Sequence, residues 1–215
     1  MTYCVGLLLN DGIVMLSDTR TNAGLDNIAT YRKMFHFESS GERVISIVTA
    51  GSLSVTQTTI ARLREAIEDQ DATEETSILK APTMLKVASI IGDTLCKVRL
   101  EIDEKLATMK QGASASMIVG AQRRGGPMRL FLIYPEGNFI EATEDTPFLQ
   151  IGEHKYGKPI LDRVVKPSTS LADAEKAVLL SMDSTLRSNL SVGMPLDLCV
   201  IEKDTCTVSR KRRIE

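Results

Sequence analysis

The chain has 215 residues, 43% of them hydrophobic, and a formal net charge of −2 at pH 7. This length suits one domain with a substantial core, and the near-neutral balance gives no broad positive field to attract nucleic acid or an anionic membrane. No apolar run is long enough to span a bilayer, and no charged segment followed by an apolar one marks a secretory leader. We therefore expect a single domain over residues 1–215 in the cytoplasm, with no nucleic-acid or membrane partner.

The chain opens with two β-rich runs, residues 2–9 and 12–18. Between them stands Asn10-Asp11-Gly12, which is typical of a tight hairpin turn with positive φ. The pattern therefore predicts a hairpin with Thr2 at its free end.

A loop through Asn22, Gly24 and Asn27 is predicted next. Two further strands are expected near residues 33–38 and 43–50. Four strands then come in succession before any helix.

The apolar spacing changes to that of a helix after residue 51. Ile60, Leu63 and Ile67 recur on one helix face, with Ser52 or Ser54 placed to cap the first turn.

A longer helix is predicted after a polar connection over residues 68–78. Pro82 is expected in its first turn, and Gln111-Gly112 ends it. A regular apolar stripe along this helix indicates core packing. The stripe consists of Met84, Val87, Ile91, Leu95, Val98, Ile102, Leu106 and Met109.

Strand patterns return in the second half of the chain. Four strands are predicted, over residues 114–122, 127–134, 138–142 and 147–151.

Two helices and two strands are expected to complete the chain. Residues 153–165 are predicted to be helical, and another helix begins after Pro167 with Ser170 as its cap. The last strands are expected over residues 196–201 and near 205–210.

Runs of strands followed by runs of helices, repeated, favour antiparallel sheets with segregated helices over βαβ units. The predicted fold class is α+β: two antiparallel sheets packed face to face, each covered on its outer side by a helix pair, in a four-layer αββα sandwich.

Thr2 is a candidate nucleophile. Removal of Met1, which is expected before a small residue, would leave a free α-amine beside the Thr2 hydroxyl. An α-amine titrates at about 7.7–8.0, so it can accept the hydroxyl proton without any histidine. Asp18 and Lys33 stand at spacings that suit an ammonium held by a carboxylate beside that hydroxyl. Each residue alone is more typical of an ordinary strand position, whereas the combination favours catalysis.

Gly51 offers a main-chain N–H between a predicted strand and a predicted helix. Such a group, with no side chain in the way, suits the oxyanion of a tetrahedral intermediate. A simple strand-to-helix turn is the alternative.

Thr2, Ser17-Asp18-Thr19-Arg20, Lys33 and Thr49-Ala50-Gly51-Ser52 resemble the N-terminal threonine peptidases of the proteasome β-subunit superfamily. The chain opening and residues 17–30 are similar to its Anbu branch, the bacterial proteasome homologues, and the similarity covers nearly the whole chain. The resemblance implies the N-terminal nucleophile (Ntn) hydrolase fold, a peptide or unfolded protein as substrate, a homo-oligomer (ring or open spiral) and a possible separate ATPase unfoldase.

The resemblance also implies site residues and two departures. The Gly51 N–H becomes the oxyanion donor, and Ser191 belongs to the catalytic set. Ser188 stands where relatives usually carry Asp, and Glu153 where they carry Ser. Glu153 could bind the N-terminal ammonium or cap the following helix, and capping is the expectation.

Other chemistries lack their residues. The two histidines, His36 and His154, have no supporting motif for a Ser-His-Asp triad, and no Cys/His cluster favours a metal site. No P-loop occurs, so no ATPase activity and no cofactor are expected. The basic run over residues 210–213 indicates a solvated terminus. Four widely spaced cysteines indicate reduced thiols: Cys4, Cys96, Cys199 and Cys206.

The sequence thus predicts a threonine-type endopeptidase that works through an acyl-enzyme on Thr2. Two alternatives stay open: a narrow-specificity amidase of the same class, and a non-catalytic assembly or binding module.

Overall fold

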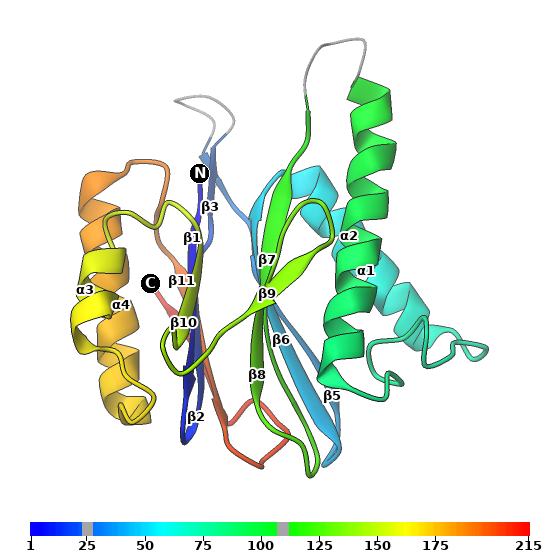
Figure 1. Ribbon diagram of the computed structural model, residues 1–215. Helices are drawn as coiled ribbons and strands as arrows, with labels where there is room; N and C mark the ends of the chain where they lie inside the picture. The colour runs from blue at the N-terminus through cyan, green and yellow to red at the C-terminus, as the bar shows by residue number, and fades with distance from the viewer. Residues whose placement is uncertain (23–27, 107–111) are drawn as a thin grey trace.

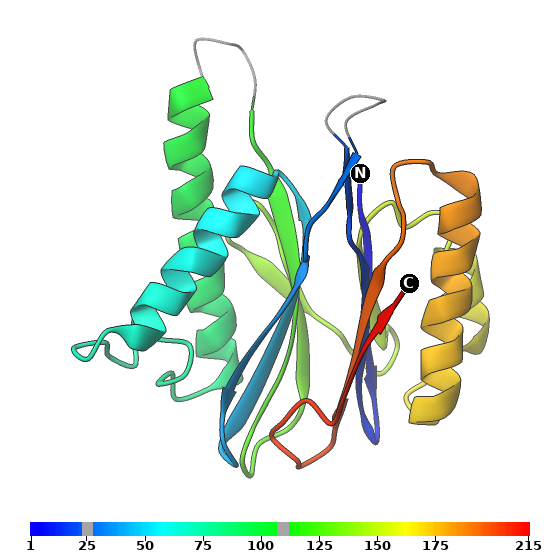
Figure 2. The ribbon, with the colours of Figure 1, turned by 180° about the vertical axis from the view of Figure 1, so that it is seen from behind.

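The computed structural model describes residues 1–22, 28–106 and 112–215. Two five-stranded antiparallel sheets lie face to face, and a helix pair covers the outer side of each (Figure 1). The predicted α+β, four-layer αββα sandwich is therefore confirmed. The view from behind shows that the N-terminus lies at the same end of the sheets as the start of the first helix, drawn in cyan (Figure 2).

The first sheet carries the N-terminal hairpin and has the strand order β10-β1-β2-β11-β12. Its strands are β1 (Tyr3–Leu9), β2 (Gly12–Asp18), β10 (Phe148–Gly152), β11 (Leu196–Glu202) and β12 (Arg210–Ile214).

The second sheet has the order β5-β6-β7-β8-β9. Its strands are β5 (Met34–Ser39), β6 (Arg43–Gly51), β7 (Ala115–Arg123), β8 (Arg129–Ile133) and β9 (Phe139–Glu141). Helices α1 (Leu53–Glu68) and α2 (Met84–Leu106) cover this sheet, and α3 (Lys158–Val164) and α4 (Leu171–Ser188) cover the first.

Three apolar cores hold the layers together. One lies between the sheets and includes Ile13, Met15 and Ile118. The others lie between each sheet and its helix pair, and most of the α2 stripe that the sequence predicted is in one of them. Met109 of that stripe and the predicted helix end at Gln111 lie outside the described residues. No helix in the described part of the chain is long and apolar enough to cross a membrane.

A short two-stranded sheet lies where only a loop was predicted. It pairs β3 (Arg20–Asn22) with β4 (Ile28–Thr30), so six strands precede α1 instead of four. Gly24 and Asn27 of the predicted loop lie outside the described residues.

The predicted positive φ in the first hairpin turn is wrong, because Asn10, Asp11 and Gly12 are not among the residues with positive φ. Neighbouring segments hold this turn: Asn10 N–H donates to the Pro167 carbonyl at 2.8 Å, and the Asp11 carbonyl accepts from Lys203 N–H at 3.0 Å. Gly12 is needed for packing, since a Cβ there would lie 2.5 Å from a carbonyl oxygen of β11.

Helix starts were predicted with mixed success. Ser170 caps α4 as expected, its hydroxyl accepting from Asp173 N–H. Ser52 occupies the cap position of α1, but its side chain makes no capping bond. Pro82 precedes α2, and Thr83 accepts the first-turn N–H of Lys86 through its hydroxyl at 3.1 Å.

The end of the chain also differs from the prediction. The last strand begins at Arg210, because Asp204 and Cys206 adopt positive φ and the segment before it turns. The basic run is exposed, as predicted, but it forms the edge strand β12, and Arg213 forms an ion pair with Asp197 at 2.9 Å.

Candidate active site

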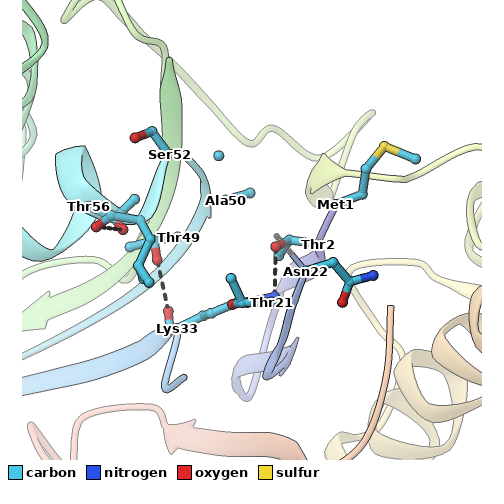
Figure 3. A pocket seen from close by; sticks show the side chains of 11 residues that line it. Met1, Thr2, Thr21, Asn22, Lys33, Thr49, Ala50, Ser52 and Thr56 are labelled. Atoms are coloured by element: carbon cyan, nitrogen blue, oxygen red, sulfur yellow. Dashed lines mark hydrogen bonds between the residues drawn. The ribbon is translucent and has the colours of Figure 1, made fainter. Parts of the chain in front are cut away.

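Thr2 lies just before β1, at the open end of the space between the two sheets. The residue is 7% exposed, and its carbonyl accepts from Glu153 N–H at 2.7 Å. Residues from the second sheet and the start of α1 face it across a cavity (Figure 3).

Lys33 immediately precedes β5 and reaches back to the N-terminal hairpin. Its ammonium donates to Thr2 Oγ1 at 2.7 Å, to Asp18 Oδ1 at 2.8 Å and to the Arg20 carbonyl at 2.5 Å. An ammonium has three protons to donate, so these contacts use its full capacity. The side chain is buried and therefore fixed against the Thr2 hydroxyl.

Asp18 ends β2 and is completely buried. Besides Lys33, its carboxylate accepts from Tyr3 N–H at 3.2 Å and from Gly193 N–H at 3.3 Å. Burial raises the pKa of Asp18 above its ordinary value, while the Lys33 ammonium and the two N–H groups oppose that rise. The salt bridge to Lys33 provides the opposite charge that a buried carboxylate requires.

Gly51 ends β6 and lines the same cavity. Its φ is +113°, and a Cβ would lie 2.3 Å from the Ser114 carbonyl oxygen. Only glycine fits this strand-to-helix turn, which brings its main chain to the cavity that holds Thr2 and Lys33.

The cavity beside these groups has a volume of about 440 Å³. Lys33 is the only charged side chain lining it among the described residues, and Met1 lies at its rim, 63% exposed. The Asn22 Oδ1 atom is buried there without a hydrogen-bond partner in the described chain. The remaining lining residues are uncharged: Thr21, Thr49, Ala50, Ser52, Leu53 and Thr56.

Ser191 is not among the cavity-lining residues. Its N–H donates to Asn189 Oδ1 at 2.9 Å, in the loop after α4. Ser188 is the last residue of α4. The structure thus brings Thr2, Asp18, Lys33 and Gly51 together. The loop of Ser191 reaches them through Gly193, whose N–H donates to Asp18 Oδ2 at 3.3 Å.

Glu153 does not cap the following helix, so the expectation is wrong. Helix α3 begins at Lys158, with Gly157 at the cap position. The Glu153 side chain instead accepts from Asn189 Nδ2 at 2.9 Å, because the chain from β10 passes next to the end of α4.

Several contacts of the site could not be predicted from the sequence, because they are made by main-chain groups. The Arg20 carbonyl and the Tyr3 and Gly193 N–H groups are main-chain partners, which any residue can provide. Asn22 was assigned only to a loop, whereas in the structure it lines the cavity.

Two antiparallel sheets between helix pairs, with Thr2 at the free end of the first strand, define the class of N-terminal nucleophile folds. The family is shown directly: the family model for proteasome subunits matches residues 2–201, and the chain belongs to that family.

Within the family the chain is an Anbu-type, proteasome β-like protein. An Anbu (Gly-1) mutant from Hyphomicrobium sp. strain MC1 is 49% identical, with all of this chain and 88% of that chain covered and a TM-score of 0.92. Anbu from Yersinia bercovieri is 42% identical, covering 99% and 86%, with a TM-score of 0.90. A helical assembly of the Anbu complex from Pseudomonas aeruginosa is 47% identical, with coverage of 99% and 86% and a TM-score of 0.92.

Proposed function

We propose that this protein is an N-terminal threonine peptidase, active once Met1 has been removed. The observation that carries the proposal is the buried Lys33 ammonium, which contacts both Thr2 Oγ1 and Asp18 Oδ1. A fixed positive charge at hydrogen-bond distance lowers the cost of forming an alkoxide.

The proposed reaction uses groups of this chain alone. The Thr2 hydroxyl attacks the substrate carbonyl carbon while its proton passes to the α-amine, and the Gly51 N–H binds the oxyanion that forms. The carbon–nitrogen bond then breaks, and the amine returns the proton to the leaving nitrogen. Water, deprotonated by the same amine, attacks the acyl ester and restores the Thr2 hydroxyl.

We further propose that the enzyme is a single-domain cytoplasmic protein that acts within a homo-oligomer on peptides or unfolded proteins. The helical assembly of the Pseudomonas aeruginosa relative supports self-association. An exposed acylating site would cleave indiscriminately, and an assembly that encloses it restricts access. A separate ATPase would supply any unfolding, since the sequence has no P-loop.

The test is intact-mass analysis before and after treatment with a β-lactone, which acylates nucleophilic hydroxyls. We expect loss of Met1 and one adduct per chain, abolished by Thr2→Ala and by Lys33→Ala. Labelling of the thiols Cys4 and Cys199 is disfavoured because both are buried, and burial raises their pKa values.

Two outcomes would reject the proposal. If Met1 stays on natively expressed protein, Thr2 has no free amine and the non-catalytic assembly module is favoured. An adduct that survives Thr2→Ala would show that another residue reacts. Measuring hydrolysis of a panel of small amides and of peptides distinguishes the peptidase from the narrow-specificity amidase.

A further inference from the structure

We propose that Glu153 is the counter-ion of the Thr2 ammonium in the processed protein. Its carboxylate would hold the amine beside the Thr2 hydroxyl and sustain the amine's basicity against the nearby Lys33 charge. Glu153 is thus a positioning residue, and the inference rests on the proposed function.

The main chain brings Glu153 next to Thr2. Gly152 pairs with Tyr3 across β10 and β1, and the next residue, Glu153, donates its N–H to the Thr2 carbonyl at 2.7 Å. Gly152 has a φ of +80°, and a Cβ there would lie 1.9 Å from the Thr2 carbonyl oxygen. The two main chains are therefore in direct contact at the residue that carries the amine.

The Glu153 carboxylate has unused hydrogen-bonding capacity. A carboxylate can accept about four hydrogen bonds, but from the part of the chain that the structure describes this one accepts one, from Asn189 Nδ2 at 2.9 Å. Its ion pair with Lys155 is 3.6 Å long, and the Lys155 side chain is 65% exposed whereas that of Glu153 is 10% exposed. Buried carboxylates are usually paired, so this site favours an additional cation.

The end of α4 adds to the negative potential. Asn189 is the C-cap of this helix, and a helix C-terminus carries roughly half a negative charge, which favours a cation nearby. Asn189 also accepts from Ser191 N–H through its Oδ1. The Asn189 amide therefore orients Glu153 and fixes the loop that contains Ser191.

Within residues 1–22, 28–106 and 112–215, the charged groups of Asp18 and Arg20 near Thr2 are already engaged. Asp18 binds Lys33 and two N–H groups, and Arg20 donates to the Leu190 carbonyl at 3.0 Å. Lys33 disfavours a second positive charge beside Thr2 Oγ1. Glu153 offsets that repulsion, so the amine stays basic enough to accept the hydroxyl proton.

The experiment measures the rate of β-lactone acylation of Thr2 against pH by intact mass, for wild type and Glu153→Gln. Glutamine keeps an oxygen for Asn189 but removes the charge. We expect the acid limb of the profile to move to lower pH by about 0.5–1 unit, because loss of the carboxylate lowers the amine pKa. The maximum rate should fall about three- to tenfold, as the base becomes weaker and less well held. Glu144→Gln, which changes an exposed carboxylate, should leave the profile unchanged.

The outcomes separate this inference from the proposed function. If wild-type protein lacking Met1 is not acylated at any pH, the proposed function fails and this inference falls with it. If wild type reacts and Glu153→Gln follows the same pH profile, the counter-ion role is rejected while the peptidase stands. A lower rate with an unmoved acid limb shows only a structural role and also rejects it.

Discussion

Two buried acidic residues, Asp18 and Glu153, belong to segments that contact the N-terminal strand, and the surroundings of their carboxylates differ. Asp18 is completely buried, and its carboxylate accepts hydrogen bonds from the Lys33 ammonium and from two N–H groups. Among the described residues, Glu153 has one amide partner and a long ion pair to an exposed lysine. The first carboxylate belongs to a closed network that fixes Lys33, whereas the second retains capacity for a charge that arises only when Met1 is removed.

The different surroundings of Asp18 and Glu153 suit two different requirements of such a site. The Lys33 ammonium, which stabilises the Thr2 hydroxyl, must stay fixed. Its hydrogen bonds are therefore already formed before Met1 is removed. The Thr2 amine must gain and lose a proton. Its counter-ion, Glu153, therefore needs hydrogen-bonding capacity beyond its contacts with Asn189 and Lys155. Measurements of stability can test this contrast, because they do not depend on finding a substrate.

The largest effect should follow loss of the Lys33 charge. Lys33→Met leaves Asp18 buried and unpaired, so we expect the free energy of unfolding to fall by about 3–5 kcal/mol at pH 7. Chemical denaturation at several pH values measures this. Without Lys33 the burial that raises the Asp18 pKa is unopposed by the ammonium, and protonation at lower pH relieves the penalty. The deficit should therefore shrink as the pH falls.

A matched control for this variant is the double change Lys33→Met with Asp18→Asn, which removes both charges. It should recover a large part of the lost stability. No recovery would show that Asp18 is not the source of the penalty, and the closed network would lose its electrostatic basis.

The next effect concerns the contact between β10 and Thr2. Gly152→Ala forces a side chain at φ +80° into the Thr2 carbonyl, and we expect a loss of at least about 2 kcal/mol. Gly125 has a φ of +70°, and a Cβ there would have nothing within 4 Å, so Gly125→Ala should cost only about 1 kcal/mol from backbone strain alone. Equal losses in a denaturation series would contradict the close approach that brings Glu153 to Thr2.

His36 is a half-buried titratable group of a different kind. Its Nδ1 contacts Ser46 Oγ at 2.9 Å, and its Nε2 is buried without a partner in the described chain. Burial, followed by the nearby Lys211 charge, lowers the pKa of His36 to about 4. Between about pH 6.5 and 4 the unfolded chain binds a proton that the folded chain does not, so stability falls as pH falls through this window.

We expect that loss to be about 1–2 kcal/mol, since His36 is only partly buried. Comparing unfolding free energies at pH 7 and pH 4.5 for His36→Gln and wild type measures it. The variant should lose less stability on acidification, whereas His154→Gln, at an exposed position, should behave as wild type. Identical pH dependence in all three proteins would exclude His36 as the source.

The residues of the site were predictable where side-chain chemistry is specific. Thr2, Asp18 and Lys33 could be assigned together because a threonine at the start, a carboxylate at a strand end and a lysine before a strand suit one mechanism. The groups that hold these side chains could not be predicted. They include the Arg20 carbonyl and the Gly193 N–H, and nearly every residue has main-chain groups of these kinds. The sheets followed from periodicity, but β3 and β4 have three residues each, too few to show a pattern.

The role of Glu153 shows a related limit. A glutamate at the start of a predicted helix, residues 153–165, suggests capping. Helix α3 begins only at Lys158, and the path of the chain past Asn189 shows the actual partner of Glu153. Burial and partner count, which decide whether a charge is free to bind another, are properties of the packed structure and not of the local sequence.

The smallest effect should be that of Glu153→Gln on protein that retains Met1, obtained from cells with methionine aminopeptidase inhibited. The carboxylate there keeps its 3.6 Å ion pair with the exposed Lys155 and lies near the negative end of α4, so its replacement should change the free energy of unfolding by less than about 0.5 kcal/mol. In processed protein the same change removes an ion pair and should cost about 1 kcal/mol more. A large loss with Met1 still present would mean that Glu153 is as fully engaged as Asp18, and the contrast between the two carboxylates would disappear.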